Sequence, residues 1–287
     1  MVNTDLFGNV IVSDPILRDK FIEPPFSILD SKSSSWVKRK KQWKALGIKS
    51  EIGRDAKTFG KFTPSKGKAN RFDDKSTSIF DPALCEVIYK WFCIEGGLIL
   101  DPFAGGSVRG IVANKLGYKY TGIDIRKEQI ESNREQGMEI LEINNQPNWY
   151  CGDSNELLSG FNTEFDFIFS CPPYVNLEVY SSLQGDISNM PYDKFMETYE
   201  SIVEKSCKLL KHDGFACFVV GEVRDKNGNY YGFVPDTIRA FEKCGMKYYN
   251  EAIFLDQLGT AAMRADGNMK TRKLVKVHQN ILIFKKA

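Results

Sequence analysis

Short apolar runs alternate with longer amphipathic stretches from about residue 76 onward. The amphipathic stretches predict helices at 107–117, 126–140, 190–214 and 237–245. Strands that alternate with helices indicate an α/β fold with a parallel, doubly wound, Rossmann-like sheet. The last two runs are joined by a loop without a helical pattern, so we expect an antiparallel addition at one edge. The apolar runs predict seven strands, at 97–101, 118–124, 148–153, 165–170, 215–223, 246–255 and 278–286.

Residues 1–75 lack this alternation and read as an irregular basic N-terminal extension. Within them, only 33–48 predicts a helix, which is short and basic and could be capped by Ser34 or Ser35. Trp36 and Trp43 lie on one face of that helix. Packing of the two rings onto the body of the protein is favoured over contact with a nucleic acid.

Charge is distributed unevenly along the chain, although the net charge is only +2. Basic residues outnumber acidic ones over 1–75, and the reverse holds for the remainder. This asymmetry suggests a polyanionic partner, but a solvated lysine-rich tail remains an equal alternative. The 7 cysteines form no CxxC pair, which argues against zinc and disulfides and for a reducing, cytoplasmic interior. The sequence contains neither a signal peptide pattern nor an apolar stretch long enough to span a membrane.

A glycine-rich turn follows the first predicted strand in the segment LDPFAGGSVRG, residues 100–110. Gly105 and Gly106 allow the backbone to approach a ligand, and the next helix begins near Ser107. The spacing is that of neither a dinucleotide-binding nor a phosphate-binding loop. Asp101 opens the turn, and a carboxylate there suits an amine or a sulfonium better than a pyrophosphate. An ordinary glycine-rich βα turn remains the alternative.

Two further carboxylates lie at the ends of the next two strands. Asp124 is placed to accept both hydroxyls of a ribose. Asp153 could accept from an adenine amino group, although capping of the following helix is almost as good an explanation. Beside one glycine-rich turn, the three carboxylates describe a nucleoside ligand without phosphates.

The strand FDFIFS, residues 165–170, runs directly into Cys171-Pro172-Pro173-Tyr174. Proline fixes its own φ and keeps the preceding residue out of helical geometry, so this turn is rigid and extended. We expect the Pro172 carbonyl to accept from an amine while Tyr174 stacks on the ring that carries it. A nucleobase with an exocyclic amino group fits, and a strand terminator with a packing tyrosine is the alternative.

These motifs resemble those of the S-adenosylmethionine-dependent amino-methyltransferases of DNA, which act on adenine N6 or cytosine N4. DPFAGGS is similar to their cofactor motif, SCPPY to their catalytic motif, and residues 76–92 to the segment that contacts the methionine moiety. Methylases of bacteriophages and actinobacteria are more similar still, since they share PPFSILD, SCPPYxxLEVYS, VVGEVRDKxG and a closing HQNxLxF. The resemblance implies S-adenosyl-L-methionine as cofactor, flipping of the target base, a possible restriction-modification context and no metal.

The resemblance assigns roles residue by residue. The implied catalytic residues are Cys171, Pro172, Pro173 and Tyr174. The implied cofactor-binding residues are Ser78, Ile79, Phe80, Asp101, Pro102, Phe103, Ala104, Gly105, Gly106, Ser107, Asp124, Ile125, Asp153, Ser154 and Cys171. Cys171 departs from the usual Asp, Asn or Ser, so Pro172 would orient more of the amine, with help from Ser170 if the register differs.

Contacts with DNA are expected outside the sheet. Only 62 residues, 108–169, separate the two motifs, which leaves no room for a target-reading domain. We therefore assign DNA reading to the extension at 1–75, to 175–190 and to the loop 256–277, and the methyltransferase domain to 76–287. The expected partner is double-stranded DNA in a bacterial or phage-infected cell, bound by a monomer or homodimer. The expected DNA-binding residues are Trp36, Lys38, Arg39, Lys40, Arg264, Lys270, Arg272, Lys273 and Lys276.

Other functions remain open at this stage. Related loops also serve methylation of RNA bases and of protein glutamine, and the basic extension disfavours glutamine. A non-catalytic nucleic-acid-binding module would not need the intact set of carboxylates. Methylation of cytosine C5 needs a Pro-Cys order, whereas this chain has Cys-Pro. A nicotinamide-dependent oxidoreductase lacks the required glycine spacing.

Overall fold

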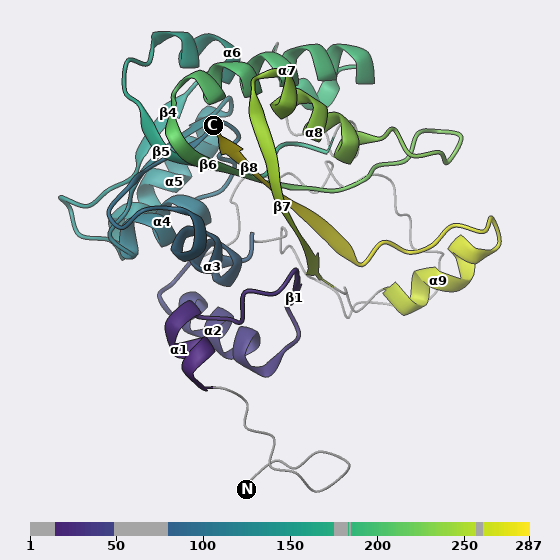
Figure 1. The fold of residues 1–287 in the computed structure, drawn as a ribbon, viewed down its shortest axis with the longest axis horizontal. Helices are drawn as coiled ribbons and strands as arrows, with labels where there is room; N and C mark the ends of the chain where they lie inside the picture. Colours follow the sequence, from purple (N-terminus) through teal and green to yellow (C-terminus); the bar gives the residue numbers. More distant parts are fainter. Residues whose placement is uncertain (1–14, 49–79, 175–182, 184, 257–260) are drawn as a thin grey trace, which may run out of the picture.

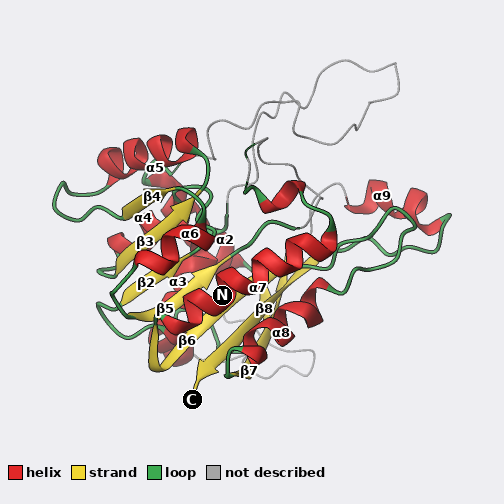
Figure 2. Ribbon diagram, turned by 90° about the horizontal axis from the view of Figure 1, so that it is seen from above, coloured by secondary structure: helices red, strands yellow, loops and turns green. Residues whose placement is uncertain are grey.

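The fold is an eight-stranded sheet with helices on both faces, in the parts of the chain that the structure describes (Figure 1, Figure 2). The structure is a computed structural model, and it describes residues 15–48, 80–174, 183, 185–256 and 261–287. The strand order is β1-β7-β8-β6-β5-β2-β3-β4. The strands are β1 (Ile28–Asp30), β2 (Leu98–Asp101), β3 (Lys119–Asp124), β4 (Asn148–Cys151), β5 (Phe165–Ser170), β6 (Leu210–Val220), β7 (Met246–Leu255) and β8 (His278–Lys286).

The sheet is doubly wound, as the sequence predicts. From β2 the chain moves outward through β3 and β4 and then returns to β5 on the other side of β2. The carboxyl ends of β2 and β5 therefore border the point at which the winding reverses, where ligands bind in such sheets. The helices are α1 (Pro15–Phe21), α2 (Ser34–Ala45), α3 (Pro82–Phe92), α4 (Val108–Lys115), α5 (Lys127–Ile140), α6 (Ser154–Leu157), α7 (Tyr192–Lys208), α8 (Phe233–Lys243) and α9 (Ala261–Met269), with short 3₁₀ turns at Leu158–Gly160 and Ile187–Asn189.

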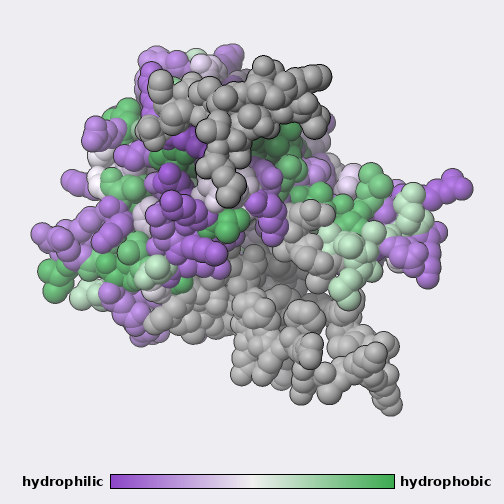
Figure 3. Space-filling view, turned by 90° about the horizontal axis from the view of Figure 1, so that it is seen from below, coloured by the Kyte–Doolittle hydropathy of each residue, from purple (hydrophilic) through white to green (hydrophobic). Residues whose placement is uncertain are grey.

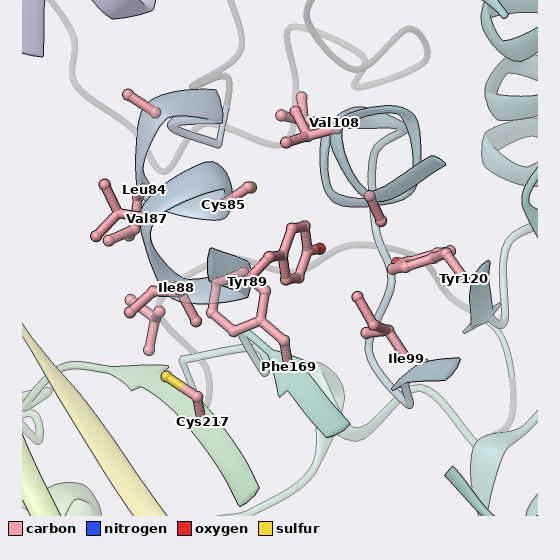
Figure 4. Packing of buried hydrophobic residues seen from close by; sticks show 14 of the residues in the cluster. Leu84, Cys85, Val87, Ile88, Tyr89, Ile99, Val108, Tyr120, Phe169 and Cys217 are labelled. Carbon is pink, nitrogen blue, oxygen red and sulfur yellow. The ribbon is translucent and has the colours of Figure 1, made fainter. Parts of the chain in front are cut away.

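Each face of the sheet carries its own apolar core. On one face Tyr89 of α3 packs edge-on against Phe169 of β5, with ring centroids 5.3 Å apart (Figure 4). On the other face Phe195 of α7 meets Phe233 of α8 at 5.4 Å. Because β5 is covered on both sides, its run of apolar residues needs no alternation, which is the pattern read from the sequence.

The far edge of the sheet differs from the prediction in three ways. The predicted antiparallel pairing of the last two strands is present, but β8 lies between β6 and β7, antiparallel to both, and not at the edge. β1, from the N-terminal extension, then pairs in parallel with β7 and makes the described strands eight rather than seven. The segment predicted as a loop without a helix contains α9. These pairings join residues far apart in the sequence, so local patterns could not reveal them.

The predicted helix at 190–214 is too long at its C-terminal end. α7 ends at Lys208, and Leu210 already pairs with Phe165 in the sheet. The amine of Lys286 donates to the carbonyls of Cys207 and Leu210, which fixes the end of the helix from a distant strand. The next helix, α8, begins at Phe233 instead of 237 because Glu222 accepts from the backbone N–H groups of its first turn.

The described part of the N-terminal extension packs tightly onto α3. Helix α2 confirms the predicted basic helix, but its cap is Ser33, which accepts from the Trp36 amide, and the predicted caps Ser34 and Ser35 lie inside the helix. The indole N–H groups of Trp36 and Trp43 donate to two carboxylates, those of Asp81 and Glu86 respectively. Trp36 is only 1% exposed, so its assignment to DNA contact is wrong in this fold, and packing on the body explains it. The predicted boundary at residue 75 lies outside the described residues.

Two of the cations in α2 are also engaged in this packing. Arg39 pairs with Glu86 at 2.8 Å and Lys40 with Asp81 at 2.8 Å. Each carboxylate therefore receives one indole and one cation, which neutralises a charge that would be costly to bury alone. Lys38, on the outer face of the helix, remains exposed.

Trp36→Ala should lower the free energy of unfolding by about 3–5 kcal/mol, the usual cost of deleting a large buried side chain. The ring packs on Phe254 of β7 with centroids 5.5 Å apart, so the loss removes contact with the sheet itself. Urea unfolding followed by fluorescence measures the change. Lys38→Ala, on the exposed face of the same helix, should change stability by less than about 0.5 kcal/mol. Equal stability of the two variants would contradict the packing described here.

Candidate functional site

A cavity of about 220 Å³ lies at the carboxyl ends of β2, β3, β4 and β5. It brings together most of the residues that the sequence singled out. The predicted site residues that line it are Phe80, Pro102, Phe103, Gly105, Gly106, Ser107, Asp124, Ile125, Asp153, Ser154, Cys171, Pro172, Pro173 and Tyr174. Asp101 and Ala104 lie beneath it, both 0% exposed. Ser78 and Ile79 fall outside the described residues.

Asp101 is the centre of a buried hydrogen-bond network. Its Oδ2 accepts from Arg109 Nε at 2.5 Å and from the Tyr120 hydroxyl at 2.6 Å. Its Oδ1 accepts from the Ser170 hydroxyl at 2.5 Å and from the Phe103 amide at 3.1 Å. A carboxylate with this many donors is held in the structure rather than presented to a ligand. This geometry therefore does not favour direct contact between Asp101 and the cofactor.

The charges in this network shift the pKa values of Arg109 and Tyr120. Burial is the largest single effect on the pKa of Arg109 and lowers it, but the charge and hydrogen bond of Asp101, together with Tyr120 and Cys171, outweigh burial and raise that pKa well above its usual value. Burial, reinforced by the negative charge of Asp101, raises the pKa of Tyr120 well above its usual value. The guanidinium thus stays charged and the phenol stays protonated, so both remain donors to Asp101.

Side chains from neighbouring helices hold the glycine-rich loop by donating hydrogen bonds to its carbonyl groups. Arg109 Nη2 donates to the carbonyls of Phe103 and Ala104, at 2.6 and 2.8 Å. Asn133 Nδ2 donates to the carbonyl of Gly105 at 2.7 Å. Gly105 has φ +51°, in the left-handed region that only glycine adopts freely. The Ser154 hydroxyl binds the Pro102 carbonyl at 2.6 Å, so side chains from α4, α5 and α6 fix the loop.

The two other strand-end carboxylates both line the cavity. Asp124 accepts from the backbone amides of Gly105, at 3.0 Å, and Arg126, at 2.8 Å, which aims its side chain across the loop. Asp153 caps α6 by accepting from the Asn155 amide at 2.8 Å, and it lines the cavity as well. The capping interpretation of Asp153 is confirmed, whereas acceptance from an adenine amino group stays a prediction that the position of Asp153 in the cavity permits.

Gly185 closes the cavity from the far side. Its φ is +96°, and a Cβ there would come within 3.0 Å of the Asp153 carboxylate and 3.3 Å of Ile125. A Cβ would crowd these two residues, and the left-handed φ also favours glycine at this position. The rest of the predicted stretch 175–190 is described only in part, since 175–182 and 184 lie outside the described residues.

Cys171-Pro172-Pro173-Tyr174 forms the opposite wall. Pro172 is buried, whereas Cys171 and Tyr174 are partly exposed toward the cavity. Cys171 Sγ lies 3.6 Å from the Tyr174 hydroxyl. The suggestion that Ser170 might contact the substrate is wrong, because Ser170 is 0% exposed and its hydroxyl donates to Asp101.

The predicted cations after β7 lie on a projecting part of the molecule. Arg264 lies on α9, and Lys270 and Arg272 follow it; all three are exposed. Figure 3 shows hydrophilic and hydrophobic side chains mixed on this projection, at the right, where Figure 1 places α9. Lys273 approaches Gly228 of the loop after β6, and Lys276 is partly buried, which lowers its pKa.

Sequence reasoning missed Arg109, Asn133 and Gly185. One signal was available for Arg109, since a lone cation inside the apolar helix VRGIVAN requires a buried partner. Asn133 and Gly185 gave no local signal, because their roles depend on elements that meet only in the folded chain.

Comparisons with known proteins identify similar methyltransferases. Residues 19–135 match the model of the DNA methylase family that covers N6 and N4 enzymes, which confirms the resemblance found in the segment that contains DPFAGGS. The Type II methyltransferase M2.DpnII of Streptococcus pneumoniae is 43% identical over 54 residues, which is 19% of this chain and 19% of that protein. The Cys-Pro-Pro-Tyr segment lies beyond the family match, so its role stays a prediction.

Solved structures show the same fold. A putative RNA methyltransferase from Pyrococcus horikoshii superimposes with a TM-score of 0.51 at 17% identity, over 87% of this chain and 96% of that one. The magnesium protoporphyrin IX methyltransferase of Synechocystis PCC 6803, solved with bound SAM, has a TM-score of 0.46 at 11% identity, over 72% of this chain and 79% of that one. The superposition on the Pyrococcus horikoshii protein shows a shared Rossmann-like fold.

Asp101→Asn should destabilise the protein by about 3–5 kcal/mol, because it leaves the buried guanidinium of Arg109 without its counter-charge. Denaturant unfolding measures this loss. Asp213→Asn, which alters an exposed carboxylate, should stay within about 0.5 kcal/mol of the parent protein. A fully stable Asp101→Asn protein would mean that the ion pair does not support the loop.

Proposed function

We propose that this protein transfers a methyl group from S-adenosylmethionine to the exocyclic amine of a base in double-stranded DNA, adenine N6 or cytosine N4. The observation that carries the proposal is the shared cavity. The glycine-rich loop after β2 and the Cys-Pro-Pro-Tyr turn after β5 line the same space. A methyl donor and an amine must lie within van der Waals reach for direct transfer, and one cavity between two loops allows this.

The cofactor side of the cavity suits a nucleoside without phosphates. Asp124 and Asp153 present carboxylates to the space, and Ile123 and Ile125 supply apolar surface between them. Carboxylates accept from hydroxyl and amino groups, and they would repel a pyrophosphate. When bound, S-adenosylmethionine supplies an electrophilic methyl group on its sulfonium. The part of the chain in contact with it would be the loop 102–107, with Asp124 and Asp153.

The substrate side of the cavity suits a flat, amino-bearing ring. Tyr174 offers an aromatic face, and base stacking on such a face is worth about 1–3 kcal/mol. In a duplex the amine is paired inside the helix, so the base must be flipped out at a cost of a few kcal/mol. The Pro172 carbonyl would orient the amine. Cys171 would contribute little, since a thiol is a weak hydrogen-bond partner.

DNA is favoured as substrate by the family match and by the cations that remain exposed. Lys38 on α2, Arg264 on α9, and Lys270 and Arg272 after α9 face solvent and would contact phosphates. Arg39 and Lys40 contribute less, because both hold α2 on α3. All 7 cysteines are free thiols, which fits our assignment to a bacterial or phage-infected cytoplasm. In the described parts of the chain, no helix is long and apolar enough to cross a membrane.

Incubation with S-adenosylmethionine labelled in its methyl group should place label in duplex DNA. Digestion to nucleosides should then recover it as N6-methyladenosine or N4-methylcytidine in their deoxy forms. Matched duplex RNA should remain unlabelled. Label in RNA alone would indicate an RNA methyltransferase instead. Binding of DNA without any methyl transfer would favour a non-catalytic module.

Two substitutions should distinguish the proposed cofactor side of the cavity from the proposed substrate side. Tyr174→Ala should lower turnover on DNA by at least about tenfold, through loss of stacking, and leave the cofactor dissociation constant unchanged. Asp124→Ala should weaken cofactor binding by about tenfold, through loss of a charged hydrogen-bond acceptor. Calorimetry with S-adenosylmethionine measures binding, and the labelling assay measures turnover. The reverse pattern would show that the two sides are assigned wrongly.

A further inference from the structure

The hydroxyl of Tyr174 is held by a residue far away in the sequence. Gln279 Nε2 donates to Tyr174 Oη at 2.5 Å, across 105 residues of chain. On its other side the hydroxyl lies 3.6 Å from Cys171 Sγ. Gln279 belongs to the closing segment HQNILIF, which the sequence marked as shared with phage methylases but to which the proposed function gives no role.

The topology of the sheet explains how Gln279 reaches the site. The strands that border the cavity end at its edge, so a parallel strand brings its last residues there. β8 is antiparallel to its neighbours β6 and β7, so it brings its first residues to that edge instead. Gln279 is the second residue of β8 and lies beside Phe254, near the end of β7. The antiparallel insertion thus places an amide behind the catalytic turn.

We propose that Gln279 is a positioning residue that fixes the ring of Tyr174 as a stacking surface for the flipped base. This inference rests on the function proposed above. Two prolines fix the backbone before Tyr174, but they do not fix rotation of its side chain. A hydrogen bond at the far end of the ring restricts that rotation, so the base meets a surface that is already ordered. Positioning of this kind lowers the entropy cost of reaching the reactive geometry.

The same contacts give Cys171 a role. The amide nitrogen of Gln279 can only donate, so the oxygen of Tyr174 accepts. The hydroxyl hydrogen can then be shared with the sulfur of Cys171. Position 171 would support the tyrosine instead of binding the amine, which accounts for a thiol where the related enzymes usually carry a stronger hydrogen-bond partner.

Gln279→Leu keeps the size of the side chain but removes the donor. It should reduce kcat on duplex DNA by about 2- to 12-fold, the loss expected for one hydrogen bond, with the cofactor dissociation constant and the unfolding temperature unchanged. Asn280→Leu is the matched control, because its amide lies on the same strand but donates to Glu251 on the surface. The control should retain kcat within about twofold.

A double-mutant cycle tests whether Gln279 acts through the hydroxyl. Tyr174→Phe should lose the same factor as Gln279→Leu, and the double variant should be no slower than either single one. Gln279→Glu, whose carboxylate can accept from the hydroxyl, should recover part of the loss. Normal turnover by Gln279→Leu, or losses that multiply in the double variant, would overturn the inference. A wild-type protein that methylates no nucleic acid would instead overturn the proposed function, and this inference with it.

Discussion

The buried ion pair between Asp101 and Arg109 is the interaction on which both halves of the site depend. Removing two charges from water is costly, and the cost is recovered only when every donor and acceptor finds a partner. Here Arg109 also donates to two carbonyls of the glycine-rich loop, and Asp101 also accepts from Tyr120 and Ser170. The pair therefore converts a flexible loop into a fixed surface.

Asp101 links the two loops because Ser170 ends the strand that leads into Cys-Pro-Pro-Tyr. One carboxylate oxygen accepts from Ser170, and the other accepts from Arg109, which clamps the glycine-rich loop. The proposed cofactor side and the proposed substrate side are thus anchored to the same carboxylate. For a reaction that depends on the relative position of two ligands, this common anchor is the simplest way to keep their separation constant.

The described part of the N-terminal extension contributes to the fold. Its tryptophans, Arg39 and Lys40 bind the carboxylates of Glu86 in α3 and of Asp81, which caps α3, and β1 extends the sheet beyond β7. Part of the positive charge of this basic segment, that of Arg39 and Lys40, is therefore used within the fold. Among the described residues, the exposed Lys38 on α2 and the exposed cations on and after α9 could take part in the proposed phosphate contacts, and Figure 1 places α2 and α9 in different parts of the molecule.

The sequence alone determined the doubly wound sheet, the two loops at its edge and the carboxylates at the ends of β3 and β4. These features follow from local periodicity, glycine and proline geometry and the rule that ligands bind at carboxyl ends of parallel strands. Tertiary structure decided that Asp101 is buried under the loop, that Trp36 is a core residue and that β8 lies inside the sheet. It also decided that Arg109 turns back onto the glycine-rich loop, and which distant side chains, Asn133 and Gln279, support the two loops. Such contacts join residues far apart in the chain, and no local pattern encodes which partner a buried polar group will meet.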